Sequence, residues 1–383
     1  MPFTPSTSSD DNFFVQDLSA YDNFKQCFPD ELFEYIALQT NQYSVLTSGS
    51  SINANSFEIE QLIGILLFSS VIKAPSYRDY WSPKSIVPCI ANVMGVSRFE
   101  KIKQFFHMCD NTNMKCRGEN GYDPLFKVRR VYDEVRNRCR KLPVSEQESI
   151  DEQMIPFKGR HHNKQYIPQK PHPWGFKMIS RSSSDGLIHD FLLYAGPDTE
   201  MIDPLPNVST VSNAVRTLCL TIPQDCRNIK LFMDNFYMTF DLMKQLRSEM
   251  SIQCTGTMRN NRLHGAHSIL QTEKDMKKEG RGAVDQVVDC NSGITVVRWC
   301  DKRCVTMAST WLHKDPIDSC RRYDKKNKEF VNVQRPNIVK EYNQHMGGLD
   351  LSDMLMSLYK ISRKSRKYYM RILYYLLGVA TVN

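Results

Sequence analysis

The chain has 383 residues, and 41% of them are hydrophobic, which is enough to bury a sizeable core and to form two or three domains. It carries a formal net charge of +8. An apolar run at residues 62–72 is bounded by Glu60 before it and Lys73 after it. It is far shorter than the roughly 20 residues that span a bilayer, so it is predicted to be a core helix rather than a membrane segment.

Residues 1–27 are rich in Ser, Thr, Asp and Pro and show no sustained hydrophobic period, which predicts a disordered acidic tail. From residue 28 to 146 apolar residues recur at steps of three and four, the period of an amphipathic helix. This region is therefore predicted to be α-helical, with helices at 30–38, 57–72, 97–107 and 128–142.

The pattern then changes to β-strands. Strands are predicted at 176–180, 188–194, 229–233 and 252–256, with helices at 210–220 and 240–248. This order predicts an α/β fold in which helices flank a mixed sheet, the arrangement of an RNase H-like core.

A long segment separates Asp234 from Asp350 (350 − 234 = 116 positions), too long for a single connection. Within it, residues 284–308 have the pattern of strands. We therefore expect a small β insertion domain at 261–335.

Aspartates occupy three short neighbourhoods that carry the most specific chemistry in the chain. Asp151 and Asp234 lie at or near the end of strand-like runs, and Asp350 and Asp353 open a helical pattern after Gly347-Gly348. The glycine pair is expected to let the backbone bend sharply before that helix. A lone Asp usually caps a helix or forms a turn, but together these residues favour a shared carboxylate site.

Carboxylate oxygens are the ligands that Mg²⁺ and Mn²⁺ prefer. Two such ions about 3.5–4 Å apart can activate an attacking oxygen and stabilise a leaving one at phosphorus. Asp353 could instead orient another ligand, and Glu152, on the opposite strand face from Asp151, is not expected to share its metal.

Two basic tracts without acidic residues flank these motifs. One tract contains Lys158, Arg160, Lys164, Lys170, Lys177 and Arg181, and the other contains Lys360, Arg363, Lys364, Arg366, Lys367 and Arg371. Such tracts suit a polyphosphate ligand, although an isolated charge run is more often a solvated face.

Other residues leave alternatives open. For His161 and His162 we favour phosphate contacts or simple exposure over burial, and for Trp174 we favour a loop anchor in the core over base stacking. The twelve cysteines contain no Cys-x-x-Cys pair, which predicts reduced, mostly buried thiols in an intracellular protein. Cys300 and Cys304 could bind a metal only with distant partners such as His313 and Cys320, so a structural role is favoured.

Four segments occur in this order: Ile150-Asp151-Glu152-Gln153-Met154-Ile155-Pro156-Phe157-Lys158-Gly159-Arg160 with Tyr166-Ile167-Pro168-Gln169-Lys170-Pro171 and Trp174-Gly175-Phe176-Lys177; Met233-Asp234-Asn235-Phe236-Tyr237; Thr255-Gly256-Thr257-Met258-Arg259-Asn260-Asn261-Arg262 with Trp299-Cys300-Asp301-Lys302-Arg303; and Tyr342-Asn343-Gln344-His345-Met346-Gly347-Gly348-Leu349-Asp350-Leu351-Ser352-Asp353. In sequence, order and spacing these segments resemble the piggyBac transposase family, including transposase-derived proteins that host genomes have retained.

The resemblance implies a nuclear, homodimeric transposase that cleaves and joins double-stranded DNA with two Mg²⁺ or Mn²⁺ ions. It implies Asp151, Asp234 and Asp350 as catalytic metal ligands, with Asp353 assisting. The expected DNA contacts are Lys158, Arg160, Lys164, Lys170, Lys177, Arg259, Arg262, Arg363, Lys364, Arg366 and Lys367.

The expected division is a helical dimerisation and DNA-binding part at 28–146, completed by 355–383, and an RNase H-like catalytic part at 147–260 and 336–354. The chain stops at Asn383 within a helix-like run and is expected to be a fragment, because many family members also carry a cysteine-rich zinc-binding domain at the C-terminus. The leading alternative is a catalytically silent DNA-binding protein that keeps the fold. A stand-alone RNase H-like nuclease is less favoured.

Overall fold

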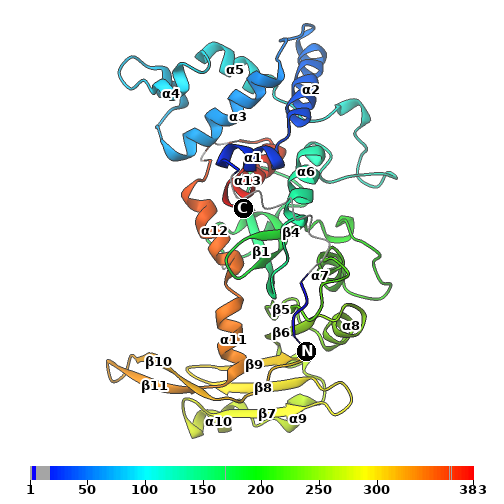
Figure 1. Ribbon diagram of the computed structural model, residues 1–383, viewed down its shortest axis with the longest axis vertical. Helices are drawn as coiled ribbons and strands as arrows, with labels where there is room; N and C mark the ends of the chain where they lie inside the picture. The colour runs from blue at the N-terminus through cyan, green and yellow to red at the C-terminus, as the bar shows by residue number, and fades with distance from the viewer. Residues whose placement is uncertain (1, 6–17, 169, 362, 364) are drawn as a thin grey trace.

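The computed structural model describes residues 2–5, 18–168, 170–361, 363 and 365–383. Figure 1 shows an elongated molecule with helices at one end, a sheet in the middle and further strands at the other end. Its α-helices are α1 (Ala20–Cys27), α2 (Asp30–Ser48), α3 (Ser56–Val71), α4 (Pro88–Ala91), α5 (Val96–Phe105), α6 (Arg129–Arg140), α7 (Thr210–Leu220), α8 (Phe240–Met250), α9 (Ala266–Ile269), α10 (Glu273–Glu279), α11 (Asn337–His345), α12 (Gly348–Leu358) and α13 (Tyr368–Val382). Its strands are β1 (Gln147–Pro156), β2 (Gln165–Tyr166), β3 (Trp174–Ser183), β4 (Ile188–Leu193), β5 (Lys230–Met233), β6 (Gln253–Thr257), β7 (Val284–Val288), β8 (Thr295–Cys300), β9 (Cys304–Ser309), β10 (Asp318–Asp324) and β11 (Glu329–Arg335).

The central sheet is mixed, as predicted. Its order is β2-β3-β1-β5-β6-β9-β8-β7, with β4 paired to β3. The pairs β1–β5 and β5–β6 are parallel, whereas β1–β3 and β6–β9 are antiparallel. Helices α7 and α8 pack on one face through a shared apolar core, and α11, α12 and α13 contact the sheet through β1. The predicted α/β fold with a mixed sheet and flanking helices is confirmed.

The N-terminal helices and the C-terminal helix share one apolar core. Side chains of α2, α3, α5 and α6 pack together with those of α13, so the C-terminal helix lies beside the N-terminal helices (Figure 1). The helices predicted at 30–38, 57–72, 97–107 and 128–142 are all present, with α2 extending ten residues further than expected. In the part of the chain that the structure describes, we find no helix with the length and apolarity to cross a bilayer.

The disordered tail predicted at 1–27 is wrong for the residues that the structure describes there. Ser19 and Asp22 form a capping box at the start of α1, so an acidic residue that suggested disorder instead stabilises a helix N-terminus. Thr4 also exchanges two backbone hydrogen bonds of 3.0 Å with Arg227. Residues 1 and 6–17 lie outside the described residues.

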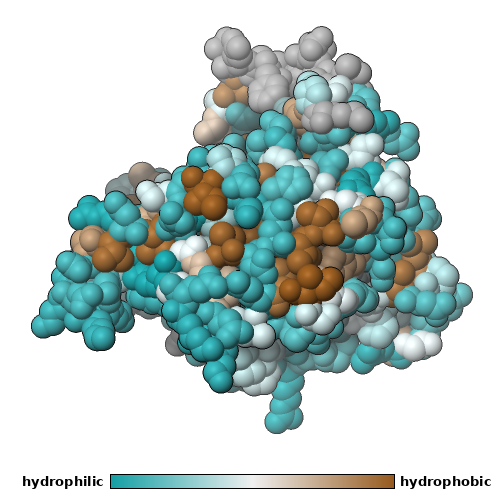
Figure 2. Space-filling model, turned by 90° about the horizontal axis from the view of Figure 1, so that it is seen from below, coloured by the Kyte–Doolittle hydropathy of each residue, from teal (hydrophilic) through white to brown (hydrophobic). Residues whose placement is uncertain are grey.

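The strands predicted between 284 and 308 are present, but they do not form a separate sheet. Strands β7, β8 and β9 extend the central sheet because β9 pairs with β6, which covers the edge that β6 would otherwise expose. Strands β10 and β11 form a second, two-stranded sheet. Figure 2 views this end of the molecule and shows a mostly hydrophilic surface with separate apolar areas; the exposed apolar side chains of this segment include Ile269, Val288, Ile317 and Phe330.

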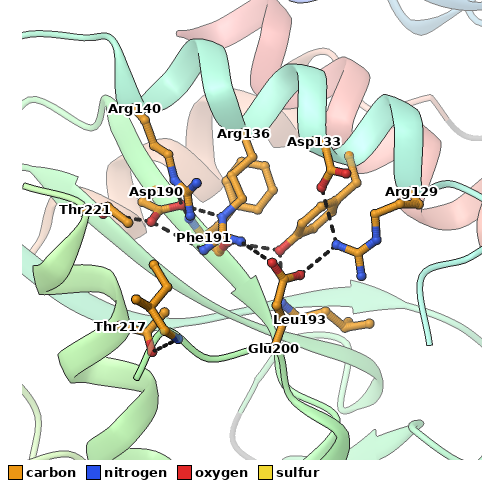
Figure 3. Close-up of polar contacts among 12 residues, drawn as sticks. Arg129, Asp133, Arg136, Arg140, Asp190, Phe191, Leu193, Glu200, Thr217 and Thr221 are labelled. Carbon is orange, nitrogen blue, oxygen red and sulfur yellow. Dashed lines mark hydrogen bonds and ion pairs between the residues drawn. The ribbon is translucent and has the colours of Figure 1, made fainter. Parts of the chain in front are cut away.

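A buried ion-pair network fastens the helical part to the sheet. Figure 3 shows Arg136 and Arg140 of α6 directed at Asp190 of β4, with Thr221 at the end of α7 on the same carboxylate. The Arg136 Nε–Asp190 Oδ1 distance is 2.6 Å, and the Thr221 hydroxyl donates to Asp190 Oδ2 at 2.9 Å. Asp190 is fully buried, so these donors replace the water that a carboxylate needs.

Of the two glycines before Asp350, Gly348 allows close packing, and Gly347 does not use the left-handed backbone conformation that favours glycine. Gly347 has an ordinary φ of −83°. A Cβ on Gly348 would lie 2.1 Å from the backbone oxygen of Ser183 in β3, whereas a Cβ on Gly347 would have no neighbour within 4 Å. The role predicted for the pair is therefore corrected: Gly348 lets α12 approach β3.

Gly348→Ala is accordingly expected to destabilise the fold by about 1–3 kcal/mol, because the helix has to move away from β3. Gly347→Ala is the matched control and is expected to leave stability unchanged or slightly higher. Chemical denaturation of both variants compares them. Equal stability of the two would contradict the close approach of α12 to the sheet.

Candidate active site

Asp151 and Asp234 lie next to each other at the centre of the sheet. Strands β1 and β5 pair in parallel register up to the residues just before these two aspartates. Neighbours in register point to the same face, about 4.7–4.9 Å apart along the hydrogen-bonding direction. The register continues to Thr257 at the end of β6, whose hydroxyl donates to Asp234 Oδ1 at 2.8 Å.

Helix α12 brings two further aspartates to the same face. It packs against β1 and β3, with Asp350 exposed in its first turn and Asp353 half-buried one turn later. Gln153, two residues after Asp151 and thus on the same strand face, donates from Nε2 to Asp353 Oδ1 at 2.7 Å. Burial raises the pKa of Asp353, and this hydrogen bond opposes the rise.

Gln153 itself is held firmly. Its side-chain oxygen accepts hydrogen bonds from Ser180 Oγ at 3.0 Å and from the Tyr375 hydroxyl at 2.7 Å. It is 1% exposed, and its partners come from β3 and α13. The position of Asp353 is therefore set by three packed elements rather than by α12 alone.

Burial and the negative charges of three aspartates raise the pKa of one tyrosine, Tyr342. Burial raises the pKa of Tyr342 on α11, and the negative charges of Asp234, Asp151 and Asp350 raise it further. One side chain is thus within electrostatic reach of aspartates from β1, from the end of β5 and from α12. Tyr342 therefore lies near all three neighbourhoods, although they are far apart in the sequence.

Asp151 carries the electrostatic signature of a crowded carboxylate. Burial raises its pKa to about 7, with smaller contributions from the negative charges of Glu152 and Asp234, while Lys170 lowers it. Ionising a carboxyl group in such surroundings is costly unless a cation is close. A divalent ion would supply that positive charge.

Glu152 lies on the opposite face of β1, as its sequence position predicts. It accepts a hydrogen bond from the buried Tyr237 hydroxyl at 2.9 Å and is 3.6 Å from Lys177 Nζ. Thr257, Gln153 and Tyr342 were not singled out from the sequence. They stand inside the motif segments around the aspartates, but a polar residue beside an Asp gives no signal of its own without strand register.

The donor set fits Mg²⁺ or Mn²⁺ chemically, since every candidate ligand is a carboxylate oxygen. Among the described residues, however, no three His, Cys, Asp or Glu side chains come close enough to hold an ion between them. The arrangement is a pair of aspartates on the sheet facing a pair on α12.

Cys300 and Cys304 are direct partners across β8 and β9, and His313 Nδ1 is 2.9 Å from Thr295 Oγ1.

A basic groove opens beside this face. It has a volume of about 920 Å³ and is lined by residues that include Lys158, Arg160, Trp174, Arg363, Arg366 and Arg371. A smaller cavity of about 250 Å³ shares His172, Lys360 and Arg371 with the groove and reaches Lys170 and Asp353. Lys158, Arg160 and Arg366 are exposed, so their positive charges can meet a polyanion.

Several residues expected to contact DNA are engaged in the protein instead. Lys177 is 4% exposed and lies 3.8 Å from the centroid of the Phe236 ring, which makes the expected phosphate contact wrong. Arg262 donates to the backbone oxygens of Asn235, Phe236 and Met238, and Arg259 donates to the Asn235 side chain, so both hold the loop after Asp234.

In the second tract, Lys367 donates to the Gln104 backbone oxygen at 3.5 Å, and the Arg363 guanidinium lies 5.4 Å from the Tyr80 ring centroid. Lys364 lies outside the described residues.

His161 is also not the exposed or phosphate-binding residue that we expected. It packs against Phe176 and Tyr368 with ring centroids 5.1 and 4.4 Å away. Burial and the neighbouring His162 lower its pKa to about 4, so it is neutral at physiological pH. His162 is exposed and its Nε2 is 2.5 Å from the Tyr122 hydroxyl. Trp174, in contrast, is 50% exposed and is not a core anchor.

Comparison with known proteins is consistent with this geometry. The family model described as Transposase IS4 matches residues 19–383. Human PiggyBac transposable element-derived protein 3 is 30% identical over 368 residues, covering 95% of this chain and 60% of the relative. Human PiggyBac transposable element-derived protein 2 is 26% identical over 376 residues, covering 96% of this chain and 61% of the relative. The chain thus spans about 60% of the length of these relatives.

A solved structure shows the same fold. The piggyBac transposase in a synaptic complex with hairpin DNA, determined by cryo-EM, superposes with a TM-score of 0.78 at 22% identity. The match covers 100% of this chain and 76% of that chain.

Proposed function

The chain belongs to the piggyBac group of the IS4 transposase family, and from this premise we propose that it cleaves and joins double-stranded DNA. One observation carries the proposal: Asp151 and Asp234 stand side by side on neighbouring parallel strands and face the helix that carries Asp350 and Asp353. This is a hard-oxygen site next to a basic groove.

We assign Asp151, Asp234 and Asp350 as the residues that would hold two Mg²⁺ or Mn²⁺ ions. Bound there, the ions would activate an attacking oxygen and stabilise the leaving oxygen at phosphorus. Thr257 orients the Asp234 carboxylate, and Gln153 orients Asp353. Lys170, whose Nζ donates to the Glu152 backbone oxygen at 2.9 Å, offsets part of the negative charge around Asp151.

We propose that the DNA backbone runs along the basic groove. The piggyBac transposase of the same fold was solved with hairpin DNA, and a DNA backbone suits exposed Lys and Arg that contact phosphates without reading sequence. The proposal extends to a nuclear homodimer in which residues 28–146 with 355–383 dimerise and bind DNA, 147–260 with 336–354 carry the chemistry, and 261–335 form the insertion.

Duplex binding is expected to weaken steeply with salt, because each neutralised phosphate releases counterions and contributes about 0.9 to the slope of log affinity against log salt concentration. Lys158→Ala/Arg160→Ala should reduce that slope by about 0.9 for each phosphate that is no longer neutralised. Lys244→Ala/Lys274→Ala, which changes two exposed lysines of α8 and α10, is the control and should keep it. Fluorescence anisotropy at several salt concentrations measures the slope, and identical slopes for both double variants would remove the groove from the DNA path.

A catalytically silent DNA-binding protein is the second candidate. Among the described residues, no three His, Cys, Asp or Glu side chains lie close enough to hold an ion between them. This spacing favours a chain that keeps the fold and the groove without the metal-dependent chemistry.

The deciding experiment incubates the chain with Mg²⁺ and a duplex carrying the terminal sequences that flank its own gene. Strand cleavage that is lost in EDTA supports the transposase. Tight binding with no cleavage in Mg²⁺ or Mn²⁺ supports the silent protein. If the chain neither binds nor cleaves this duplex, both candidates are contradicted.

A further inference from the structure

Trp174 lines the basic groove and presents an exposed aromatic surface. It begins β3 and is 50% exposed. Its cross-strand partner on β2 is Tyr166, which is 54% exposed, with ring centroids 4.7 Å apart. Two large aromatic side chains are thus left facing solvent on one short hairpin, although burying them would stabilise the fold.

The surroundings of this aromatic pair are cationic. Lys164 Nζ lies 4.8 Å from the Trp174 ring centroid and donates to the Gly159 backbone oxygen at 2.9 Å. None of the described residues that line the groove is Asp or Glu, while Lys158, Arg160 and Arg366 line it and are exposed. Aromatic rings interleaved with cations suit a ligand that has both flat faces and phosphates.

The groove also leads toward the aspartates. Its wall of His172, Lys360 and Arg371 is shared with the smaller cavity, which is lined by Asp353. Arg371 holds this wall in place by donating to the Pro156 backbone oxygen at 2.9 Å and to the Arg363 backbone oxygen at 3.0 Å. A nucleic acid strand lying in the groove would therefore continue to the carboxylate face.

From these observations we propose that the groove binds unpaired DNA nucleotides, with a base stacked on Trp174 and the adjoining phosphates on Lys158, Arg160 and Arg366. The proposal rests on the proposed function and deepens it by naming the form of DNA that this part of the site takes. Bases inside a duplex are stacked on each other and offer no free face, whereas an unpaired base stacks readily on an aromatic side chain. A volume of about 920 Å³ is at the upper end of the roughly 300–1,000 Å³ typical of small-molecule pockets and leaves room for a nucleotide.

The alternative role for Trp174 is structural, since cross-strand aromatic pairs stabilise hairpins. The two roles differ in one measurable property, the preference for DNA with an unpaired extension over blunt DNA. If Trp174 only stabilises the β2–β3 hairpin of the protein, replacing it should change the affinity for both DNA forms equally. If Trp174 stacks on a base, replacing it should weaken binding of the extended DNA alone.

The test compares binding of a blunt duplex and of the same duplex with a short single-stranded extension containing 2-aminopurine. The protein carries Asp151→Asn and the buffer contains EDTA, so cleavage cannot interfere with binding. We expect tighter binding of the extended duplex and quenching of the 2-aminopurine fluorescence. Trp174→Leu should lower the ratio of the two affinities by about 5- to 150-fold and abolish the quenching. Trp174→Phe, which keeps an aromatic face, should retain most of both.

Trp174→Leu keeps an apolar side chain against Tyr166, and a circular dichroism spectrum identical to that of the parent protein establishes that the hairpin is folded. An unchanged affinity ratio and unchanged quenching in folded Trp174→Leu would overturn the inference. That result would leave the proposed function intact, because Mg²⁺-dependent cleavage by the protein with Asp151 restored is measured separately. If the protein with Asp151 does not cleave DNA, but the affinity ratio and the 2-aminopurine quenching still depend on Trp174, the result counts against the transposase function and not against base stacking.

Discussion

Asp151→Asn and Asp234→Asn are each expected to lower Mg²⁺-dependent DNA cleavage by roughly 10³-fold or more, because an amide cannot supply the charge that a shared metal site requires. The two side chains are adjacent on β1 and at the end of β5, so either change alters the ligands of the same ions. Single-turnover cleavage assays on the terminal-sequence duplex measure the effect. Gln153→Ala, which frees Asp353, should cost only about 10- to 100-fold.

The fold should survive these changes. Ionised Asp151 opposes folding above its pKa of about 7, because that pKa is raised above the value of an unfolded aspartate; the penalty vanishes as the pH falls below the unfolded value. Metal-free Asp151→Asn should therefore be at least as stable as the parent protein above neutral pH.

Asp203→Asn, at an exposed position with φ of 42° that Asn tolerates, is the control for activity. Full cleavage by Asp151→Asn or Asp234→Asn would remove that residue from the site.

Asp190→Ala is expected to destabilise the protein by about 3–5 kcal/mol, the typical cost of removing one partner from a buried ion pair. Arg136 is 3% exposed and would be left without its 2.6 Å carboxylate partner, and the Thr221 hydroxyl would lose an acceptor. Because this network joins α6, β4 and α7 (Figure 3), the helical part and the sheet should loosen together. Urea denaturation followed by circular dichroism measures the loss.

Glu134→Ala is the matched control on the same helix. Its partner is Arg130 at 3.0 Å, in a partly exposed i,i+4 pair at the surface, and i,i+4 pairs on a helix surface contribute about 0.3–0.5 kcal/mol. Equal destabilisation by Asp190→Ala and Glu134→Ala would show that burial of the network contributes nothing.

Much of the fold follows from local patterns. The period-of-two runs that became β3, β4, β5 and β6, and the amphipathic runs that became α2, α3, α5 and α6, are local signals that tertiary packing reinforces. The place of Asp350 in the first turn of α12 follows in the same way from Gly347-Gly348 and the helical pattern after it. The prediction of disorder failed for the residues of α1 because composition cannot distinguish a flexible acidic stretch from a helix whose Asp22 takes part in an N-terminal capping box.

Features that depend on pairing between distant segments could not be predicted. That β9 would extend the central sheet through β6, rather than join a separate insertion sheet, depends on strand register. Which basic residues are exposed could not be predicted either: Lys177 is buried beside Glu152, whereas Lys158 is exposed. Both are lysines of one tract, and only the fold decides which of them faces a ligand.

The central claim is that aspartates from three sequence segments hold divalent ions on one face of the sheet. Iron-directed backbone cleavage tests it most directly, because Fe²⁺ occupying a Mg²⁺ site generates radicals that cut the chain next to its ligands. With Fe²⁺, ascorbate and peroxide, we predict cuts close to Asp151, Asp234 and Asp350, suppressed by excess Mg²⁺ and lost in Asp151→Asn. Cuts elsewhere, or cuts at these positions that persist in excess Mg²⁺ and in Asp151→Asn, would contradict the shared metal site.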